Sequence, residues 1–435
     1  MAARERHSLD QIDNGNIDIG GRMIDYLWMW SEFMVRWLHV VAGIAWIGSS
    51  FYFIALDLSL KPGKQLPDSA HGEAWQVHGG GFYNMVKYLV APARMPDELT
   101  WFKWEAYTTW LSGFALLTII YYAGAGLYMI DTEILDLEPW QAVVLSIGGI
   151  AGGWVAYDAL CRSPLGRDTR GLVIAGFAFI VFLAWGYAEI FSARGAFVQI
   201  GVTIGTIMVA NVAMVIIPGQ KKVVAKLIAG EEPDPQHGTR AKQRSLHNNY
   251  LTLPVVFVMI GGHYPAVFAT EYAWVILALV LVIGGLIRHF FNTKHKGEPA
   301  PWWTWIAAAA LVAGAVMLSQ AGAPKYDEEA YAEYEFGDGA ALHMAAVELV
   351  TERCAICHAH VPQWDGMGFA PKGVVLETEA DILRYVDDIY WQVAASHAMP
   401  PGNIIWVENE ERAMLANWRA MLRADGVPAK AEKDG

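Results

Sequence analysis

Eight apolar segments, each long enough to cross the ~30 Å hydrocarbon core of a bilayer, constrain this chain more than any other feature. They lie near residues 33–57, 106–129, 139–160, 171–191, 196–217, 249–268, 272–291 and 302–320. Aromatic residues collect at several of their ends, where such rings anchor helices at the lipid headgroups. Because 54% of the residues are hydrophobic and only 17% are charged, we expect a polytopic membrane helix bundle of about eight spans.

The loops between these segments alternate in charge. Lysine and arginine cluster after the first, third, fifth and seventh segments, whereas the intervening loops carry almost none. Basic loops mark the cytoplasmic side, so both ends of the chain are expected in the periplasm of a bacterium, with the body in its inner membrane. The net charge of −13 gives no basic stripe for nucleic acid, and no nucleic-acid partner is expected.

The composition divides the chain into four parts. A polar periplasmic tail (1–25) precedes the transmembrane domain (26–320). An acidic, aromatic linker (321–339) leads to a region of ordinary soluble composition (340–435). The predicted fold class is therefore all-α, a membrane bundle followed by a periplasmic domain.

The stretch 353-RCAICHAH-360 in this last region carries a Cys-x-x-Cys-His pattern. In a cytosolic βαβ context two such cysteines would indicate redox thiols, and a zinc site would need more ligands than the region supplies. The pattern instead favours one covalent c-type haem, with thioethers from Cys354 and Cys357 and with His358 as the proximal iron ligand.

The surroundings of the motif support this interpretation. A helix-compatible stretch, 341–353, leads into Cys354, and a second predicted helix, 408–422, closes the domain. Between them Met399 precedes two prolines, and its thioether is predicted to be the distal iron ligand. Met367 is the rival, but it follows His358 by only nine residues, a short loop to pass around a haem. This order resembles class I cytochrome c.

Four histidines lie in or near the apolar segments, namely His39, His247, His263 and His289. Polar groups at membrane depth are costly and often functional, although each of these could be an ordinary interfacial residue. The sixteen residues from His247 to His263 would span ~24 Å of helix, enough to place one redox site on each side of the membrane. A haem b held by His39, His263 or His289 is therefore a further hypothesis.

The stretch 245-SLHNNYLTLPVVFVMIGGHYP-265 is dense in hydrogen-bonding groups. Asn248 and Asn249 are suited to the amide edges of a flat heterocycle, and Tyr250 to stacking or donation. With His247 they form the predicted catalytic group. The alternative is that these residues only cap a helix at the membrane boundary.

Three membrane blocks and the CAICH module together resemble a known family. The blocks are 36-RWLHVVAGIAWIGSSFYF-53, 75-WQVHGGGFYNMVKY-88 and 245-SLHNNYLTLPVVFVMIGGHYP-265. The chain resembles the bacterial membrane-bound urate oxidases (urate hydroxylases) fused to a C-terminal cytochrome c domain. That resemblance implies oxidation of urate to 5-hydroxyisourate in purine catabolism. Electrons would pass to a respiratory acceptor, such as a cytochrome c or a cytochrome c oxidase, without forming hydrogen peroxide.

Two other functions stay open at this point. One is a haem b/c respiratory subunit that oxidises quinol. The other is a non-catalytic, membrane-anchored cytochrome that only relays electrons. The relay function leaves the eight apolar segments unexplained, because one helix is enough to anchor a cytochrome.

Overall fold

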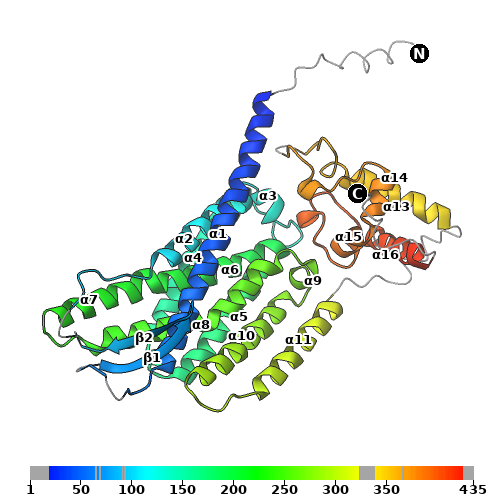
Figure 1. Cartoon of the computed structure of the whole chain (residues 1–435). Helices are drawn as coiled ribbons and strands as arrows, with labels where there is room; N and C mark the ends of the chain where they lie inside the picture. The colour runs from blue at the N-terminus through cyan, green and yellow to red at the C-terminus, as the bar shows by residue number, and fades with distance from the viewer. Residues whose placement is uncertain are drawn as a thin grey trace, which may run out of the picture.

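The computed structural model describes residues 19–63, 66–67, 70–90, 92, 95–322, 339–364 and 367–424, apart from the side chains of 19–22 and 25. Most of the expected N-terminal tail (1–25) and linker (321–339) lies outside the described residues. The rest forms two parts, a helical body up to residue 322 and a C-terminal module from residue 339 (Figure 1).

The body consists mainly of long helices. They are α1 (Ile19–Ser59), α2 (Trp104–Leu116), α4 (Pro139–Arg162), α5 (Thr169–Ala188), α6 (Ala193–Ala210), α7 (Ile217–Ile228), α8 (Pro235–Gly261), α10 (Ala273–His295) and α11 (Trp303–Ala321). Two short helices, α3 (Ala125–Tyr128) and α9 (Pro265–Phe268), lie in loops. Wider π-helical turns, η1 (Leu117–Tyr122) and η3 (Asn211–Ile216), extend α2 and join α6 to α7, and the 3-10 turn η2 (Pro164–Arg167) follows α4.

Six of these helical segments are long and apolar enough to cross a membrane. They are α1, α4, α5, the continuous α6–η3–α7 segment, α10 and α11. The other two predicted spans are helical as well, but α8 begins with charged residues such as Arg240 and Lys242, and α2 begins with Trp104 and Glu105. The expectation of about eight spans is thus supported for six.

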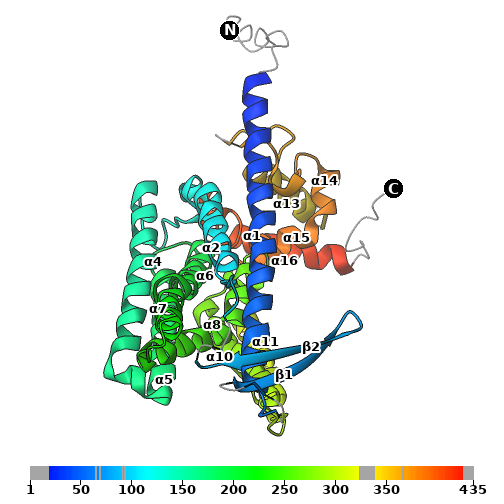
Figure 2. The same cartoon turned by 60° about the vertical axis from the view of Figure 1, so that its left-hand side comes forward.

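Helix α6 lies at the centre of the body and packs against α2, α4, α5 and α8. Figure 2 shows α6 inside the body and α1 along its outside. Most side chains of α6 are buried, whereas α1 and α11 expose large apolar residues such as Trp37, Ile44 and Ile306. A bundle that is apolar inside and outside is expected for helices that face lipid.

Glycines allow the central helices to approach closely. A Cβ atom on Gly201 of α6 would lie 2.8 Å from Val258 of α8, and one on Gly284 of α10 would lie 2.7 Å from Pro254. Small residues at such crossings are typical of membrane bundles. Pro254 interrupts the sixth predicted segment and lies inside α8. Its ring fits there because Gly284 of α10, which faces it, has no side chain.

The expectation of an all-α chain needs one correction. Strands β1 (Ala70–His78) and β2 (Gly81–Tyr88) form an antiparallel hairpin in a region that was expected to be only a loop. The turn contains Gly79 and Gly80, both with positive φ, which is the geometry that a two-residue hairpin requires. Aromatic and β-branched residues on both sides of that turn, such as Trp75, Val77, Phe82 and Tyr83, favour strands.

The C-terminal module contains the two predicted helices, α13 (Gly339–Cys354) and α16 (Asn409–Ala424). Shorter elements lie between them: α14 (Glu379–Arg384), α15 (Val386–Ile389), η4 (Pro371–Gly373), η5 (Tyr390–Ala394) and η6 (Pro401–Asn403). Trp418 of α16 is fully buried in the core, and its Nε1 donates to Nδ1 of His343 in α13 at 3.0 Å. The hydrophobic face predicted for the closing helix therefore packs on the helix that leads into the CxxCH motif.

The module lies at one end of the body (Figure 1). The hairpin and the α4–α5 and α10–α11 loops, which carry many of the basic residues, lie at the opposite end (Figure 1). At the module's end, Ala398 is buried within the body's own core cluster, and η6 packs on α3. The N-terminal part of α1 also reaches the module, where Tyr26 meets Phe369 edge to face at 5.2 Å.

Candidate functional site

The CxxCH motif begins at the last residue of α13 and turns at once. The backbone N–H of His358 donates to the carbonyl of Cys354 at 2.9 Å, which closes the turn. Nδ1 of His358 lies 3.0 Å from the carbonyl oxygen of Val374. Since a carbonyl can only accept, Nδ1 carries the proton and Nε2 keeps its lone pair, which is the tautomer of an iron-ligating histidine. Burial also lowers the pKa of His358 and favours this neutral form.

Met399 packs on the hydrophobic core of the module, as Cys354 does. Its N–H donates to the carbonyl of Gln392 at 2.8 Å, and the buried guanidinium of Arg412 donates to its own carbonyl at 2.9 Å. Met367 does not pack on that core cluster, and its N–H donates to the carbonyl of Trp364, three residues before it. Met399 as the distal sulfur stays a prediction.

The residues of the module fit a haem better than a bare metal ion. Within the described ranges, no three His, Cys, Asp or Glu side chains are close enough together to hold a metal. Burial raises the pKa of Cys354 to about 12 and also raises that of Cys357. Two protonated thiols followed by an oriented histidine are the set that covalent haem attachment uses, with a methionine sulfur available on the other side.

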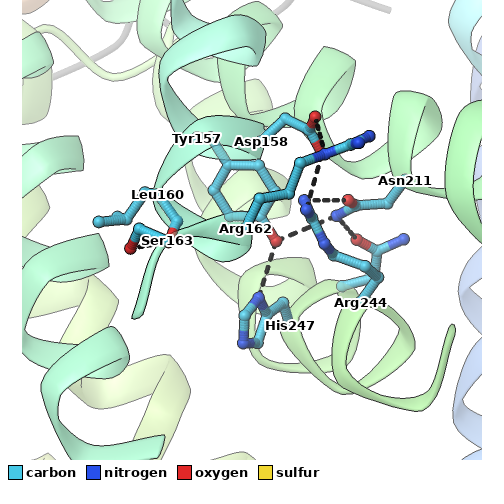
Figure 3. Close-up of polar contacts among 9 residues, drawn as sticks. Tyr157, Asp158, Leu160, Arg162, Ser163, Asn211, Arg244 and His247 are labelled. Carbon is cyan, nitrogen blue, oxygen red and sulfur yellow. Dashed lines mark hydrogen bonds and ion pairs between the residues drawn. The ribbon is translucent and has the colours of Figure 1, made fainter. Parts of the chain in front are cut away.

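A second group of polar side chains is buried inside the body, between α4, η3 and α8. This Arg244 network consists of Tyr157, Asp158, Asn211, Arg244, His247 and Asn248 (Figure 3). Arg244 is only 3% exposed, pairs with Asp158 at 2.7 Å and donates to Oδ1 of Asn211 at 3.0 Å. A charge buried this deeply is tolerated because a carboxylate and an amide compensate it.

The Arg244 network has one consistent hydrogen-bond direction as far as Tyr157. Because Oδ1 of Asn211 accepts from the guanidinium, its Nδ2 donates to the Tyr157 hydroxyl at 3.2 Å and to Oδ1 of Asn248 at 2.9 Å. The Tyr157 hydroxyl lies 2.7 Å from Nδ1 of His247; it donates to this nitrogen when the imidazole carries its proton on Nε2 and accepts from it when the proton is on Nδ1. Nδ2 of Asn248 completes the set by donating to the Met208 carbonyl at 2.8 Å. The bond therefore couples the position of the His247 proton to the orientation of the Tyr157 hydroxyl.

A third group, the Arg288 network, lies on the other side of α8. Nε of Arg288 donates to Oδ1 of Asn249 at 3.1 Å, and Nη2 donates to Oδ1 of Asn292 at 3.1 Å. Nδ2 of Asn292 also donates to Oδ1 of Asn249 at 3.2 Å. The guanidinium stacks on the ring of Phe51 at 3.9 Å, which brings α1 into the site. Consecutive residues of α8 thus belong to two different networks.

The two arginines of these networks were not among the predicted site residues. Arg244 and Arg288 were counted among the basic residues of the cytoplasmic loops, yet both lie in helices and are buried. One signal could have revealed them. Arg244 precedes His247 and Asn248 by three and four residues, and Arg288 precedes Asn292 by four, so each arginine shares a helix face with an amide.

The other predicted residues lie apart from these networks. His39 bonds through Nδ1 to the Thr109 carbonyl at 2.9 Å, an arrangement that orients a ligating histidine. The imidazoles of His263 and His289 are exposed and form no side-chain hydrogen bond within the described part of the chain. Tyr250 is half-buried and interacts electrostatically with Arg288. Thus His247 and Asn248 lie in one network and Asn249 in another, and the haem b stays a prediction.

One comparison with known proteins identifies the body. The family described as "Urate oxidase N-terminal" matches residues 25–319, which cover the body with all its buried networks and end before the module. No curated protein and no solved structure matches the chain. The match covers more than half of the sequence, and it includes α8 and α10, which carry Arg244 and Arg288. The chain therefore belongs to the urate oxidase N-terminal family.

Proposed function

We propose that this chain is a membrane-bound urate oxidase that converts urate to 5-hydroxyisourate and delivers the electrons to a c-type haem in its own C-terminal module. The observation that carries the proposal is the combination of a urate oxidase body with a CxxCH module that packs on it through the loop of Met399. A body that oxidises a small molecule and a module built to accept electrons are thereby joined in one chain.

The reaction requires an acceptor for two electrons. Urate takes up one water and loses two electrons and two protons to give 5-hydroxyisourate. A haem c held by Cys354, Cys357, His358 and Met399 would accept one electron at a time and would leave no ligand position for oxygen. The two electrons from one urate would then leave in two one-electron steps, so that no hydrogen peroxide would need to form. An external cytochrome c or a cytochrome c oxidase is the proposed final acceptor.

The protein's own residues supply the remaining chemistry. Urate is a flat, anionic, amide-rich purine, and the body buries two guanidiniums, each among asparagine side chains. The Tyr157–His247 pair is placed to move a proton. When the imidazole carries its proton on Nε2, Nδ1 can take a proton from Tyr157 while Nε2 releases its own. We therefore keep His247, Asn248, Asn249 and Tyr250 as the proposed catalytic group and add the two arginines to it.

The location follows from the helices. Six helices suited to crossing a membrane support a bacterial inner-membrane protein embedded in the lipid bilayer. The module and the basic loops lie at opposite ends of the body (Figure 1), which fits a periplasmic haem and cytoplasmic basic loops. A haem b in the body stays a prediction that rests on the orientation of His39.

Anaerobic mixing tests the proposal. The oxidised full-length protein is mixed with urate without oxygen, and the c-haem absorption is followed. Urate should reduce the haem, with one urate consumed for every two haems, while a quinol should not. Cys354→Ala should retain the folded body and lose the signal. If quinol reduces the haem and urate does not, the protein is a respiratory subunit; if neither does, it is a relay cytochrome.

A further inference from the structure

The two buried arginines of the body differ in how their charge is compensated. Arg244 has a carboxylate partner, Asp158, which it shares with the exposed Arg162. Arg288 is equally buried, at 5% exposure, but it forms no ion pair with a carboxylate in the described parts of the chain. Its partners are the neutral oxygens of Asn249 and Asn292 and the face of Phe51. A buried cation without a counter-ion is costly, and an anionic ligand would remove that cost.

A second observation at the same place also indicates a missing ligand. Oδ1 of Asn249 accepts from both Arg288 and Asn292, which fixes the orientation of the amide. Its Nδ2 is buried and has no hydrogen-bond partner, although Asn249 is 0% exposed. Asn248, next to it, has both amide atoms satisfied. An unpaired amide donor beside an unpaired guanidinium forms a site for an acceptor that carries negative charge.

We propose that Arg288 and Asn249 form the recognition site for the purine anion, and this inference rests on the proposed function. The guanidinium would pair with the charged edge of the ring, and Nδ2 of Asn249 would donate to a carbonyl oxygen or ring nitrogen beside it. Asn292 is a positioning residue that holds both side chains. Tyr250 is the next residue along α8 and interacts electrostatically with Arg288. The Arg244 network, already satisfied, orients His247 rather than binding the anion.

Two substitutions test the site without removing bulk. Asn249→Asp keeps the shape of the side chain but places a carboxylate on Arg288, so an internal anion would occupy the site. Arg288→Met removes the charge and keeps most of the length. Lys294→Met is the matched control, because Lys294 is an exposed base at the end of the same helix. The ascorbate-reduced haem spectrum and the thermal unfolding temperature of each variant report on folding.

Binding is measured apart from turnover. The fully reduced, oxygen-free holoprotein in detergent is dialysed against labelled urate, so that no electron can leave the ligand. Asn249→Asp and Arg288→Met should each weaken urate binding by about 30-fold or more, as expected for loss of a charge-assisted contact, and Lys294→Met should leave it unchanged. The displacement of bound urate by excess chloride, with no displacement by a neutral purine, would mark a site for any small anion. That outcome would overturn the purine assignment.

The outcomes separate this inference from the proposed function. If urate reduces the wild-type haem but folded Asn249→Asp and Arg288→Met bind urate as tightly as wild type, urate is the substrate and this site is wrong. If urate neither binds nor reduces the wild-type protein, the proposed function fails and the site fails with it. Weakened binding in both variants, with the control intact, supports the site.

Discussion

The hydroxyl of Tyr157 lies 2.7 Å from Nδ1 of His247, and a chain of donors that starts at Arg244 reaches this hydroxyl through Nδ2 of Asn211. A neutral histidine with its proton on Nε2 can release that proton while it takes another from tyrosine. The Tyr157–His247 pair therefore connects the Arg244 network to any group that contacts Nε2 of His247. Neither residue could do this alone, because each depends on the other for its hydrogen-bond direction.

Tyr157→Phe should slow urate-driven haem reduction. The change removes the hydroxyl that bonds to Nδ1 of His247 and accepts from Asn211 but keeps the ring. We expect a loss of about 10²-fold or more in kcat, the range of general acid–base effects, with a small effect on KM. The pH profile of kcat should shift, which a purely structural role would not produce. The measurement is stopped-flow haem reduction between pH 6 and 9.

Tyr187→Phe is the matched control for that experiment. Tyr187 is also a buried tyrosine of the body, hydrogen-bonded to Thr203 at 2.9 Å in a separate set of contacts. Its loss should lower stability slightly and leave the pH profile of kcat unchanged. Equal losses of kcat in the two variants would contradict a role of Tyr157 in proton transfer.

Met399→Leu should remove the distal sulfur while keeping an apolar side chain of similar size. We expect the reduction potential of the haem to fall, because a thioether ligand stabilises the reduced iron, and the charge-transfer absorption of a methionine-ligated oxidised haem to disappear. Potentiometric titration of the full-length protein measures the first effect. Met367→Leu serves as the comparison and should change neither property; the reverse result would assign the distal position to Met367.

The elements of this chain follow largely from patterns visible in its sequence. The long apolar segments and the helices on both sides of the CxxCH motif are local properties, and the structure contains a helix for each of them. The hairpin was missed because Gly79-Gly80 lies between short strands inside a loop that was judged by its charge. The Gly-Gly pair between segments rich in aromatic and β-branched residues was the stronger signal.

The candidate site depended on packing that no single segment reveals. Arg288 belongs to a basic cluster near the end of an apolar segment, and charge counting assigns the whole cluster to the cytoplasm. Only the packing of α8 against α10 shows that the guanidinium of Arg288 points inward and donates to Asn249. His289, the neighbouring residue that the sequence favoured, is exposed instead. A one-residue step on a helix turns a side chain by about 100°, which separates these two environments.

Acid should weaken the C-terminal module through Asp387. Burial works against ionisation of this carboxyl, but hydrogen bonds from Arg423 and Arg419 outweigh it and lower the pKa of Asp387. A lowered folded-state pKa contributes stability that is fully present above the unfolded value of about 3.9 and is lost as the pH falls towards the folded value.

Asp387→Asn should remove that dependence. At pH 7 the variant should be less stable by about 1 kcal/mol at most, since the ion pairs are partly exposed to solvent. Below pH 4 the gap between the two proteins should narrow. The unfolding temperature of the haem-loaded protein at several pH values measures both effects. A gap that stays constant down to pH 3 would show that this carboxylate does not control acid stability.

Gly402→Ala should disturb the contact between module and body. A Cβ atom at this position would lie 2.3 Å from the carbonyl oxygen of Ile130, and the residue has a positive φ of 55°. We expect haem reduction by urate to slow at least tenfold, because the Met399 loop would move away from α3, while direct reduction by ascorbate stays the same. Gly373→Ala isolates the cause, since Gly373 has a φ of 69° but open space around its Cβ position. It carries the same backbone strain without the collision, so its urate-driven rate should match wild type. If both variants slow equally, strain within the module and not docking on the body limits electron transfer.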